Sequence, residues 1–461
     1  MSRLVAVSNR VSVPKRGASP GGLVVGLLAA MQSRGGLWFG WSGETTNLIT
    51  PPTLERRGNV EYVTTNMDEA EYKASYLGFS NSVLWPLFHS FINDFRYSDL
   101  QYEAYHRANY RFANELAGLL TPDDVIWVHD YHLIPLAQKL RDAGMRQPVG
   151  FFLHIPFPAT EILRVLPVFA ELLRDLLAYD LIGFQTRTDH DAFRSAVKQV
   201  WPESEVTDSA ISLNGRRVLT LVCPIGVDVD AIQALAAEAV QQEECRRMVA
   251  GLLGRRLMVG VDRLDYSKGL VQRFRAYERF LEAHPENHNR VTFMQIAPLS
   301  RTDVRAYSEI RRELEQVTGR ANGRFGEPDW TPIRYLNRNF PRDTLMGFLR
   351  CALIGIVTPV RDGMNLVAKE FVAAQDPADP GVLVLSNFAG AAHELGSAVL
   401  VNPYDMRGVA HAIQQALTMP LEERRERHQS MLAALRANSM NRWHGRFVGA
   451  LDDLRGSLAA A

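Results

Sequence analysis

Short apolar runs alternate with longer amphipathic stretches along almost the whole chain, and this alternation limits the fold more than any other feature. The runs are too short for buried helices and are apolar on both faces, as are strands that helices cover on both sides. They occupy residues 4–7, 125–128, 149–153, 181–184, 218–222, 257–261, 291–296, 352–357 and 382–385. The pattern predicts an α/β protein built on parallel sheets.

The stretches between the runs have the periodicity of helices that lie on a sheet, because their apolar residues recur every three or four positions. The clearest occupy residues 23–32, 160–178, 269–283, 342–350 and 409–417. With 461 residues the chain exceeds what a single core usually fills, so we expect two domains. Pro224 and Gly226 end one run just before a polar helix, which places the boundary there. We therefore predict two doubly wound Rossmann-like domains, residues 1–226 and 227–437, that face each other across a cleft.

The composition argues against several classes of protein. The chain has 51 Lys and Arg and 51 Asp and Glu, so it lacks the basic excess of a protein that binds nucleic acid or an anionic membrane. No apolar run approaches the ~20 residues of a membrane span. Cys223, Cys245 and Cys351 are odd in number and far apart, which disfavours a disulfide framework or a cysteine-based zinc site. Since no signal peptide opens the sequence, we expect a cytoplasmic protein.

Open α/β sheets bind ligands at the carboxyl ends of their strands, and residues 356–370 carry an unusual group of side chains in such a position. Asp362 precedes Gly363, which permits a tight turn, and a helical stretch then begins near Asn365. Its first backbone amides attract anions, and Glu370 lies on the face that follows them. The segment is typical of a site for a sugar or a nucleotide. The alternative interpretation is a capped helix with solvated charges.

Two cations flank another predicted helix start. Arg263 and Lys268 follow the run at 257–261, and the helix begins at Gly269. A guanidinium fork and an ammonium point charge suit the oxygens of a diphosphate, whose charge must be neutralised when a glycosyl bond breaks. Surface charge on a loop is the alternative. Arg301 repeats the pattern after the run at 291–296.

The N-terminal half places its own polar residues after strands. Asn9 and Arg10 follow the first run, and Gly21 and Gly22 precede a helix at Leu23, where bare backbone can approach a ligand. This glycine pair lacks the spacing of a dinucleotide fingerprint and is weak evidence alone.

Asp130 and His154 follow the next two runs. Asp130 is favoured as an acceptor for a hydroxyl group, and His154 is either a donor to a sugar hydroxyl or a satisfied core histidine. Tyr76 and Trp85 lie in an aromatic region where core packing and sugar stacking cannot be separated by sequence.

A metal site finds little support. His129 and His132 would need further ligands at matched spacing, and none is visible in the sequence. Asp228 and Asp230 match the Asp-x-Asp pattern of some sugar transferases, but their place at the start of a helix favours capping. We therefore predict neither a metal nor a cofactor.

These segments together closely resemble the trehalose-6-phosphate synthases, the retaining nucleotide-sugar transferases of glycosyltransferase family 20, over nearly the whole chain. The matching motifs are SNR (8–10), GGL (21–23), GLWFGWSGE (36–44), FSNSVLWP (79–86), HDYHL (129–133), GFFLHIPFP (150–158), IGFQT (182–186), VDRLDYSKGL (261–270), QIAPLSR (295–301) and RDGMNLVAKEFVAAQ (361–375). Residues 88–90 depart from the family's pattern, and the loop 12–20 is variable in such enzymes.

The resemblance implies the GT-B architecture, with residues 438–461 as a helix that crosses back to the first domain. It implies contacts to the nucleotide and diphosphate of the donor for Gly22, Leu23, Arg263, Lys268, Phe340, Leu366, Val367, Ala368, Lys369 and Glu370, with Glu370 at the ribose. It implies contacts to the donor's glucosyl group for His154, Asp362, Met364 and Asn365. It implies a site for glucose 6-phosphate formed by Arg10, Tyr76, Trp85, Asp130 and Arg301. The residues expected to take part in catalysis are Arg263, Lys268, Asp362 and His154.

The implied reaction transfers glucose from a nucleotide-diphosphate glucose, UDP-glucose in the first place, to glucose 6-phosphate and retains the α configuration. Two alternatives stay open: a transfer to glycerol 3-phosphate or a pseudo-sugar within the same architecture, and a silent sugar-phosphate sensor. A sensor is expected to lose Arg263, Lys268 or Asp362, and the chain has all three. We also expect a homo-oligomer, either a dimer or a tetramer.

Overall fold

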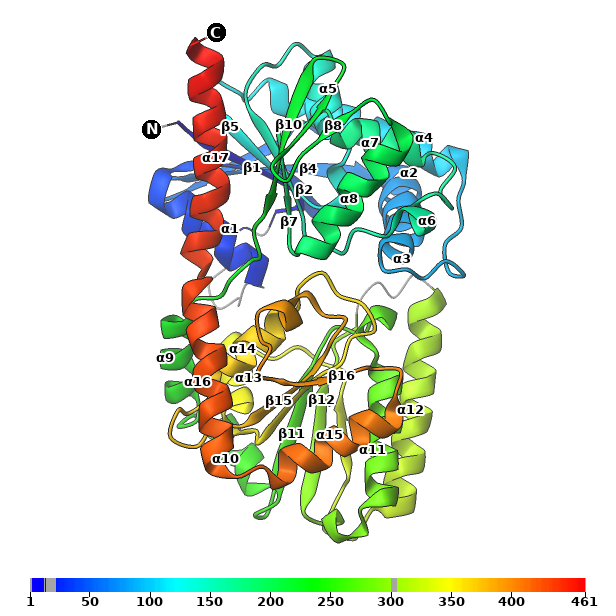
Figure 1. Ribbon diagram of the computed structural model, residues 1–461, viewed down its shortest axis with the longest axis vertical. Helices are drawn as coiled ribbons and strands as arrows, with labels where there is room; N and C mark the ends of the chain where they lie inside the picture. Colours follow the sequence, from blue (N-terminus) through cyan, green and yellow to red (C-terminus); the bar gives the residue numbers. More distant parts are fainter. Residues whose placement is uncertain (1, 12, 14–21, 300–304, 461) are drawn as a thin grey trace. The chain divides into compact units, whose positions relative to one another are not determined.

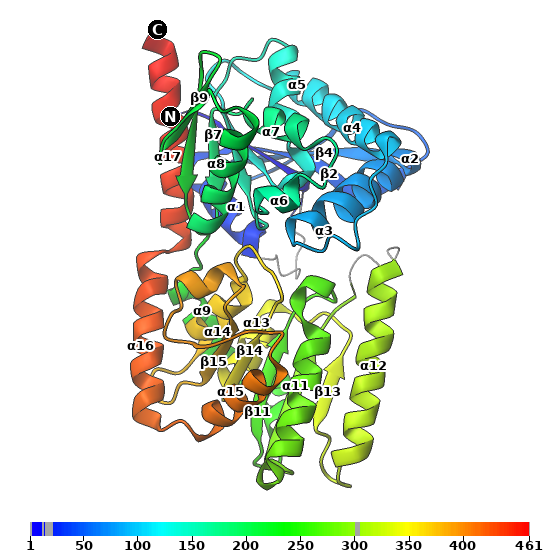
Figure 2. The same ribbon diagram turned by 45° about the vertical axis from the view of Figure 1, so that its right-hand side comes forward.

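The chain folds into two compact units in a computed structural model that describes residues 2–11, 13, 22–299 and 305–460 (Figure 1). Unit 1 comprises Met1–Ile225 and Met440–Ala461, and unit 2 comprises Gly226–Ser439. In each unit, helices flank a mostly parallel sheet, which confirms the predicted α/β class (Figures 1 and 2).

Unit 1 contains a sheet of ten strands in the order β3-β4-β2-β1-β5-β6-β7-β10-β9-β8. The strands are β1 (Leu4–Arg10), β2 (Gly36–Thr46), β3 (Thr53–Arg57), β4 (Val60–Asp68), β5 (Val125–His129), β6 (Val149–Leu153), β7 (Leu181–Phe184), β8 (Glu205–Val206), β9 (Ala210–Leu213) and β10 (Arg216–Val222). The strands from β4 to β10 in this order pair in parallel, and β3, β9 and β8 add antiparallel edges. Every residue of β6 is buried, as expected of a strand covered on both faces.

The helices of unit 1 are α1 (Gly22–Arg34), α2 (Glu69–Glu71), α3 (Trp85–Phe88), α4 (Asp99–Ala117), α5 (Leu136–Asp142), α6 (Thr160–Leu163), α7 (Phe169–Leu176), α8 (Arg187–Val200) and α17 (Met440–Ala460). The prediction of one helix over residues 160–178 was wrong, because α6 and α7 are separate. Pro167 lies between them, and it has no N–H to donate and excludes helical geometry from the residue before it.

A π-helix connects α2 to α3 and carries part of the aromatic region. It spans Tyr72–Leu84, and the side chains of Asn81 and Ser82 donate to backbone carbonyls five residues earlier. Single turns of π-helix are rare and often mark functional sites. This one presents Tyr76.

Helix α17, at the end of the chain, packs on the sheet of unit 1. The ring of Phe447 lies where a Cβ on either Gly150 or Gly183 would stand, and these glycines face it from the neighbouring strands β6 and β7. Phe447 also stacks on Trp127 of β5, with 4.9 Å between ring centroids. The two glycines therefore form a groove that this one aromatic ring fills.

Unit 2 contains a fully parallel sheet of six strands in the order β13-β12-β11-β14-β15-β16. The strands are β11 (Arg256–Val261), β12 (Val291–Ile296), β13 (Ile333–Leu336), β14 (Ile354–Val357), β15 (Val382–Ser386) and β16 (Val399–Val401). The helices are α9 (Val229–Ala239), α10 (Glu243–Ala250), α11 (Leu270–Ala283), α12 (Arg305–Phe325), α13 (Arg342–Cys351), α14 (Leu366–Ala374), α15 (Met406–Thr418) and α16 (Leu421–Ala437).

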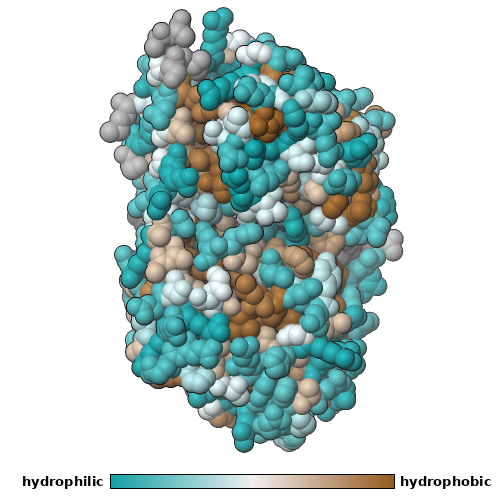
Figure 3. Space-filling view, in the orientation of Figure 1, coloured by the Kyte–Doolittle hydropathy of each residue, from teal (hydrophilic) through white to brown (hydrophobic). Residues whose placement is uncertain are grey.

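The surface has the mixed polar character expected from the composition. Hydrophilic residues cover most of the face that Figure 3 shows, and apolar residues appear among them in smaller groups. Among the described residues, no helix is both long and apolar enough to cross a membrane.

Candidate functional site

The carboxyl ends of β11 and β14 bring the two charged segments of unit 2 together. These strands pair directly, so the loops that follow them are neighbours. The Nζ atom of Lys268 lies 2.5 Å from Oδ2 of Asp362, and the side chains are only 12% and 13% exposed. The backbone amide of Val360 donates to the carbonyl of Ser267 at 2.9 Å. The structure thus joins Lys268 and Asp362 in one polar cluster, while Arg263 is exposed on the same loop as Lys268.

The loop from Asp262 to Gly269 has a well-defined conformation. Asp265 accepts hydrogen bonds from the amide and hydroxyl of Ser267 and from the hydroxyl of Tyr307. Gly269 has φ of 64°, and a Cβ there would collide with the carbonyl of Thr358. Only glycine fits this position, and the sharp turn sets the direction of Lys268.

The buried side chain of Arg273 holds this loop in place through hydrogen bonds. The Arg273 guanidinium is fully buried and donates to Asp262 at 2.5 Å, to Gln295 at 2.8 Å and to the hydroxyl of Thr358 at 2.9 Å. It also donates to the carbonyl of Lys268 at 3.3 Å. Burial raises the pKa of Asp262, and the charge of Arg273 opposes that shift. Arg273 therefore ties the loop after β11 to the end of β14.

Asn365 begins helix α14 and links it to Asp362. Its φ is 78°, its Oδ1 accepts from the amide of Ala368 at 3.1 Å, and its Nδ2 donates to Asp362 at 3.1 Å. The helix start expected near this residue is thus confirmed. Because Asn365 satisfies one amide, the amides of Leu366 and Val367 are the remaining donors of this first turn for an anion or a sugar.

Glu370 pairs with Arg342, which follows Phe340 by two residues in the sequence. Oε1 of Glu370 lies 3.1 Å from Nη2 of Arg342, the first residue of α13, and these side chains are 13% and 21% exposed. Burial raises the pKa of the Glu370 carboxyl, and Arg342 opposes the shift. The ring of Phe340 packs against Phe348, and the Arg338 guanidinium lies 4.4 Å from its centroid.

Three predicted donor residues have buried side chains. The Lys369 side chain is fully buried and pairs with Glu394, and Met364 and Ala368 are 4% and 0% exposed. The side chains of Lys369 and Ala368 are therefore not part of the polar cluster around Asp362.

Aromatic stacking gathers the predicted acceptor residues of unit 1. Tyr76 stacks on His132 with ring centroids 5.6 Å apart, and Trp85 contacts Tyr131 at 5.7 Å. Asp130 precedes these two partners at the carboxyl end of β5. The structure thus brings Tyr76, Trp85 and the Asp130 loop together.

Arg10 extends this group at the end of β1. It pairs in register with Trp41 of β2, whose ring lies 5.4 Å from that of Tyr76. The Arg10 guanidinium occupies the place of a side chain on Gly43, since a Cβ there would lie 2.5 Å from its Nε. Gly43 therefore leaves room for this arginine.

His154 lies beside the Asp130 loop within a chain of polar groups. Its amide donates to Asp130 at 3.3 Å, and its ring contacts His129 at 3.0 Å and Gln185 at 3.4 Å. Since the Gln185 amide is a donor and its oxygen accepts from Ile225, Nδ1 of His154 accepts and Nε2 carries the proton. Burial lowers the pKa of His154 to about 3, so the ring is neutral near pH 7.

For Gly22 and Leu23, two further predicted positions, the structure describes the backbone. Helix α1 begins at Gly22, so the backbone of Gly22 and Leu23 forms its first turn. Arg301 and Gly21 lie outside the described residues, as does most of the loop at residues 12–20.

The described ranges 2–11, 13, 22–299 and 305–460 contain no group of three or more His, Cys, Asp or Glu suited to a metal ion. Asp228 accepts from the amide of Ala231 at 3.1 Å, which confirms its interpretation as a helix cap.

Comparison with known proteins places this cluster of residues in a family. The model of glycosyltransferase family 20 matches residues 6–453. The chain belongs to glycosyltransferase family 20. A trehalose-6-phosphate synthase of Klebsiella pneumoniae subsp. pneumoniae is 48% identical to this family 20 chain over 449 residues, 97% of the chain and 94% of the relative.

Two solved structures are similar to this family 20 chain throughout. One is an alpha,alpha-trehalose-phosphate synthase (UDP-forming) from Burkholderia xenovorans in complex with glucose-6-phosphate, with 47% identity, a TM-score of 0.94 and coverage of 98% of this chain and 100% of that one. The other, from E. coli, is bound with UDP-2-fluoro glucose, with 46% identity, a TM-score of 0.94 and coverage of 98% and 99%.

Sequence reasoning did not single out several residues that support this site. Arg342, Arg273, Gln185 and His129 contact predicted site residues, yet none was predicted to act. Arg342 lies close in sequence to Phe340, and Gln185 lies within the family motif at 182–186. Their positions in the sequence could therefore have pointed to Arg342 and Gln185.

Proposed function

We propose that this glycosyltransferase is a trehalose-6-phosphate synthase that transfers glucose from UDP-glucose to glucose 6-phosphate with the α configuration retained. The observation that carries the proposal is the polar cluster at the carboxyl ends of β11 and β14, where Lys268 and Asn365 both contact the carboxylate of Asp362. The proteins to which the chain is 46–48% identical include the UDP-forming synthase in complex with glucose-6-phosphate and the E. coli structure bound with UDP-2-fluoro glucose.

In this proposal, most contacts to the donor come from unit 2. Arg263 and Lys268 neutralise the diphosphate, and the amides of Leu366 and Val367 add neutral donors to it. Asp362 accepts hydrogen bonds from glucose hydroxyls, and Asn365 donates hydrogen bonds to them. Glu370, held by Arg342, accepts from the ribose hydroxyls. Gly22 and Leu23 at the start of α1, together with Phe340, complete the predicted nucleotide contacts.

Most contacts to the acceptor come from unit 1, and Arg301 belongs to unit 2. Arg10, Arg301 and Tyr76 hold the phosphate of glucose 6-phosphate, and Asp130 accepts from a sugar hydroxyl. Trp85 forms an apolar wall behind the sugar. Neutral His154 contacts the transferred glucosyl group, and its ring is held in place by Gln185 at Nδ1 and by His129 at Nε2.

Retention then follows from transfer on one face of the glucosyl ring. The bond from the anomeric carbon to the diphosphate oxygen breaks, and the anomeric hydroxyl oxygen of the acceptor forms the new bond on the same face. The proton of that hydroxyl passes to the departing phosphate oxygen, which takes the place of a protein base. Lys268 and Arg263 stabilise the charge on this leaving group, which is greatest in the transition state.

A matrix of donors and acceptors tests the proposal. UDP-, GDP- and ADP-glucose are each combined with glucose 6-phosphate, glycerol 3-phosphate and free glucose, nucleotide release is measured, and the product linkage is determined by NMR. We expect the highest rate for UDP-glucose with glucose 6-phosphate and an α,α-1,1 linkage. Faster release with glycerol 3-phosphate would identify the other transferase, and no release with any pair would identify a sensor.

The oligomeric state and the location of the protein stay predictions. Light scattering after size-exclusion chromatography tests the expected dimer or tetramer, and cell fractionation tests the expected cytoplasmic location.

A further inference from the structure

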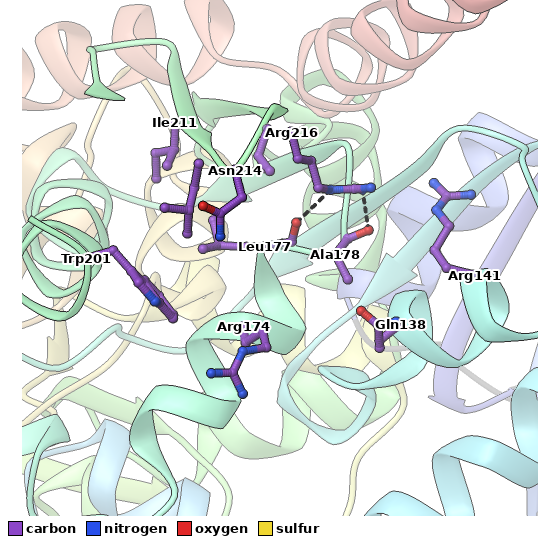
Figure 4. A pocket seen from close by; sticks show the side chains of 11 residues that line it. Gln138, Arg141, Arg174, Leu177, Ala178, Trp201, Ile211, Asn214 and Arg216 are labelled. Atoms are coloured by element: carbon purple, nitrogen blue, oxygen red, sulfur yellow. Dashed lines mark hydrogen bonds between the residues drawn. The ribbon is translucent and has the colours of Figure 1, made fainter. Parts of the chain in front are cut away.

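A cavity lies in unit 1 at the amino ends of the strands, away from the edge of the sheet that carries Asp130 and His154. It has a volume of about 380 Å³. Its walls come from the C-terminal ends of α5, α7 and α8 and from the hairpin of β9 and β10 (Figure 4). Helices that follow parallel strands end at the amino edge of the sheet, so this cavity is separate from the proposed acceptor residues.

One side of the cavity is apolar and includes an aromatic ring. Leu177, Ile211 and Val218 form part of the lining, and Trp201 lies at its edge, half-buried, directly after α8. Among the described residues, no other ring packs on the Trp201 indole, and its N–H makes no hydrogen bond to them. A half-buried flat indole beside aliphatic side chains is a surface on which a planar ligand can stack.

The other side of the cavity is cationic. Arg141 and Arg216 both pair with Asp180, at 2.6 and 3.0 Å, so these two cations share one carboxylate. Arg216 also donates to the carbonyls of Leu177 and Ala178, as the dashed lines in Figure 4 show. The cavity therefore keeps one positive charge in excess before Arg174 is considered.

Arg174 adds a second positive charge. It lines the cavity from the last turn of α7, is exposed, and makes no hydrogen bond or ion pair within the described part of the chain. As a cation at the C-terminal end of α7, Arg174 stabilises this helix. That interaction leaves the N–H donors of its guanidinium available. An unpaired guanidinium facing an apolar cavity with a net positive wall suits an anion.

We propose that this cavity binds a small molecule with a planar ring and a phosphate or carboxylate group. The ring stacks on Trp201 against the aliphatic wall, and the anion pairs with Arg174 and the outer edge of Arg216. The volume lies within the range of about 300 to 1,000 Å³ that small-molecule sites have in proteins. The site is distinct from the proposed substrate sites.

Calorimetric titration of the full chain with phenyl phosphate tests this proposal. The titration is carried out with and without UDP and glucose 6-phosphate at saturating concentration, so that binding at the substrate sites is told apart from binding in the cavity. We expect saturable binding that Arg174→Gln and Trp201→Leu each weaken by about 5- to 20-fold, the loss of one exposed charge-assisted bond or one stacked ring. A second titration with benzoate tells whether the site prefers a phosphate or a carboxylate. Saturable binding of either probe that the two variants weaken supports the site.

Arg217→Gln is the matched control. Arg217 is the next residue of β10 after Arg216, is exposed and does not line the cavity, because side chains of a strand alternate between its faces. Its removal changes the net charge as Arg174→Gln does and should leave binding unchanged. Thermal unfolding of each variant checks the fold. Equal binding by Arg174→Gln and the unchanged chain, or no binding of either probe at 10 mM, would overturn the proposal.

Discussion

Replacement of Arg342 by glutamine should weaken donor binding far more than it slows the chemical step. The variant removes the cation that lies 3.1 Å from the Glu370 carboxylate, and both side chains are mostly buried. At an effective dielectric constant of about 20, such a pair attracts by about 5 kcal/mol before desolvation is subtracted. Without Arg342 the carboxylate is neither oriented nor kept ionised, so the hydrogen bonds that we propose to the ribose are weakened.

The expected size follows from those hydrogen bonds. A hydrogen bond to a charged group contributes about 1.5–3 kcal/mol, which corresponds to a donor KM that rises about 10- to 150-fold. Since the ribose is remote from the reacting carbon, kcat should change by less than about 3-fold. Initial rates over a range of UDP-glucose at saturating glucose 6-phosphate measure both constants.

The pH dependence gives a second readout. Burial already raises the pKa of Glu370, Arg342 opposes this, and the variant should therefore have a still higher pKa. Binding needs the carboxylate, so it is lost as the pH falls through that pKa, and the variant loses it at a higher pH. The ratio of the two KM values should therefore be largest at mildly acidic pH.

Arg350→Gln is the matched control, because Arg350 lies on the same helix and pairs with Asp376 at 3.2 Å. It should leave the donor KM unchanged, and Arg342→Lys should recover most of the lost affinity. An Arg342→Gln enzyme with a normal donor KM at every pH, or with a KM raised equally by Arg350→Gln, would refute the role of this ion pair.

Three further predictions concern the same unit and the acceptor. Arg263→Ala and Lys268→Ala should each lower kcat by about 10²- to 10³-fold with circular dichroism unchanged, since each removes a group that stabilises the leaving phosphate; an active double mutant would contradict the mechanism. Free glucose should be about 10⁴-fold poorer than glucose 6-phosphate in kcat/KM, because a site built for a phosphate leaves its arginines unpaired, and comparable values would count against that site. Glu394→Gln should lower the free energy of unfolding in urea by about 3–5 kcal/mol, because it leaves the buried Lys369 ammonium without its carboxylate, whereas an unchanged midpoint would show that the pair is dispensable.

The fold class could be predicted because the central strands are buried on both faces. β6 and β14 are buried at every residue, and such runs stand out in the sequence. Edge strands lack this signal: all five residues of β3 are exposed, and the strand exists only because it pairs with β4. The π-helix at Tyr72–Leu84 also has no sequence signature, since its hydrogen bonds depend on the backbone.

The candidate site could be predicted only where a residue's chemistry was unusual for its place. Lys268 and Asp362 were found as charges that follow buried strands, and the structure joins them. Lys369 has the same charge on the same segment, yet it points inward to Glu394, because its partner lies 25 residues further along the chain. Whether a charge faces a ligand or a buried partner depends on tertiary contacts, which the sequence does not contain.

The groove of Gly150 and Gly183 has a consequence for biosynthesis. Phe447, which fills it, emerges from the ribosome only after the whole of unit 2, residues Gly226–Ser439, has been made. At 5–20 residues per second that interval is on the order of 10 to 40 s. During this time the faces of β5, β6 and β7 on which α17 packs lack this helix, although all three strands are complete. The first half to be translated is therefore the last to finish folding, and a nascent or truncated chain presents to chaperones and to other chains the strip that Trp127 and the two glycines form.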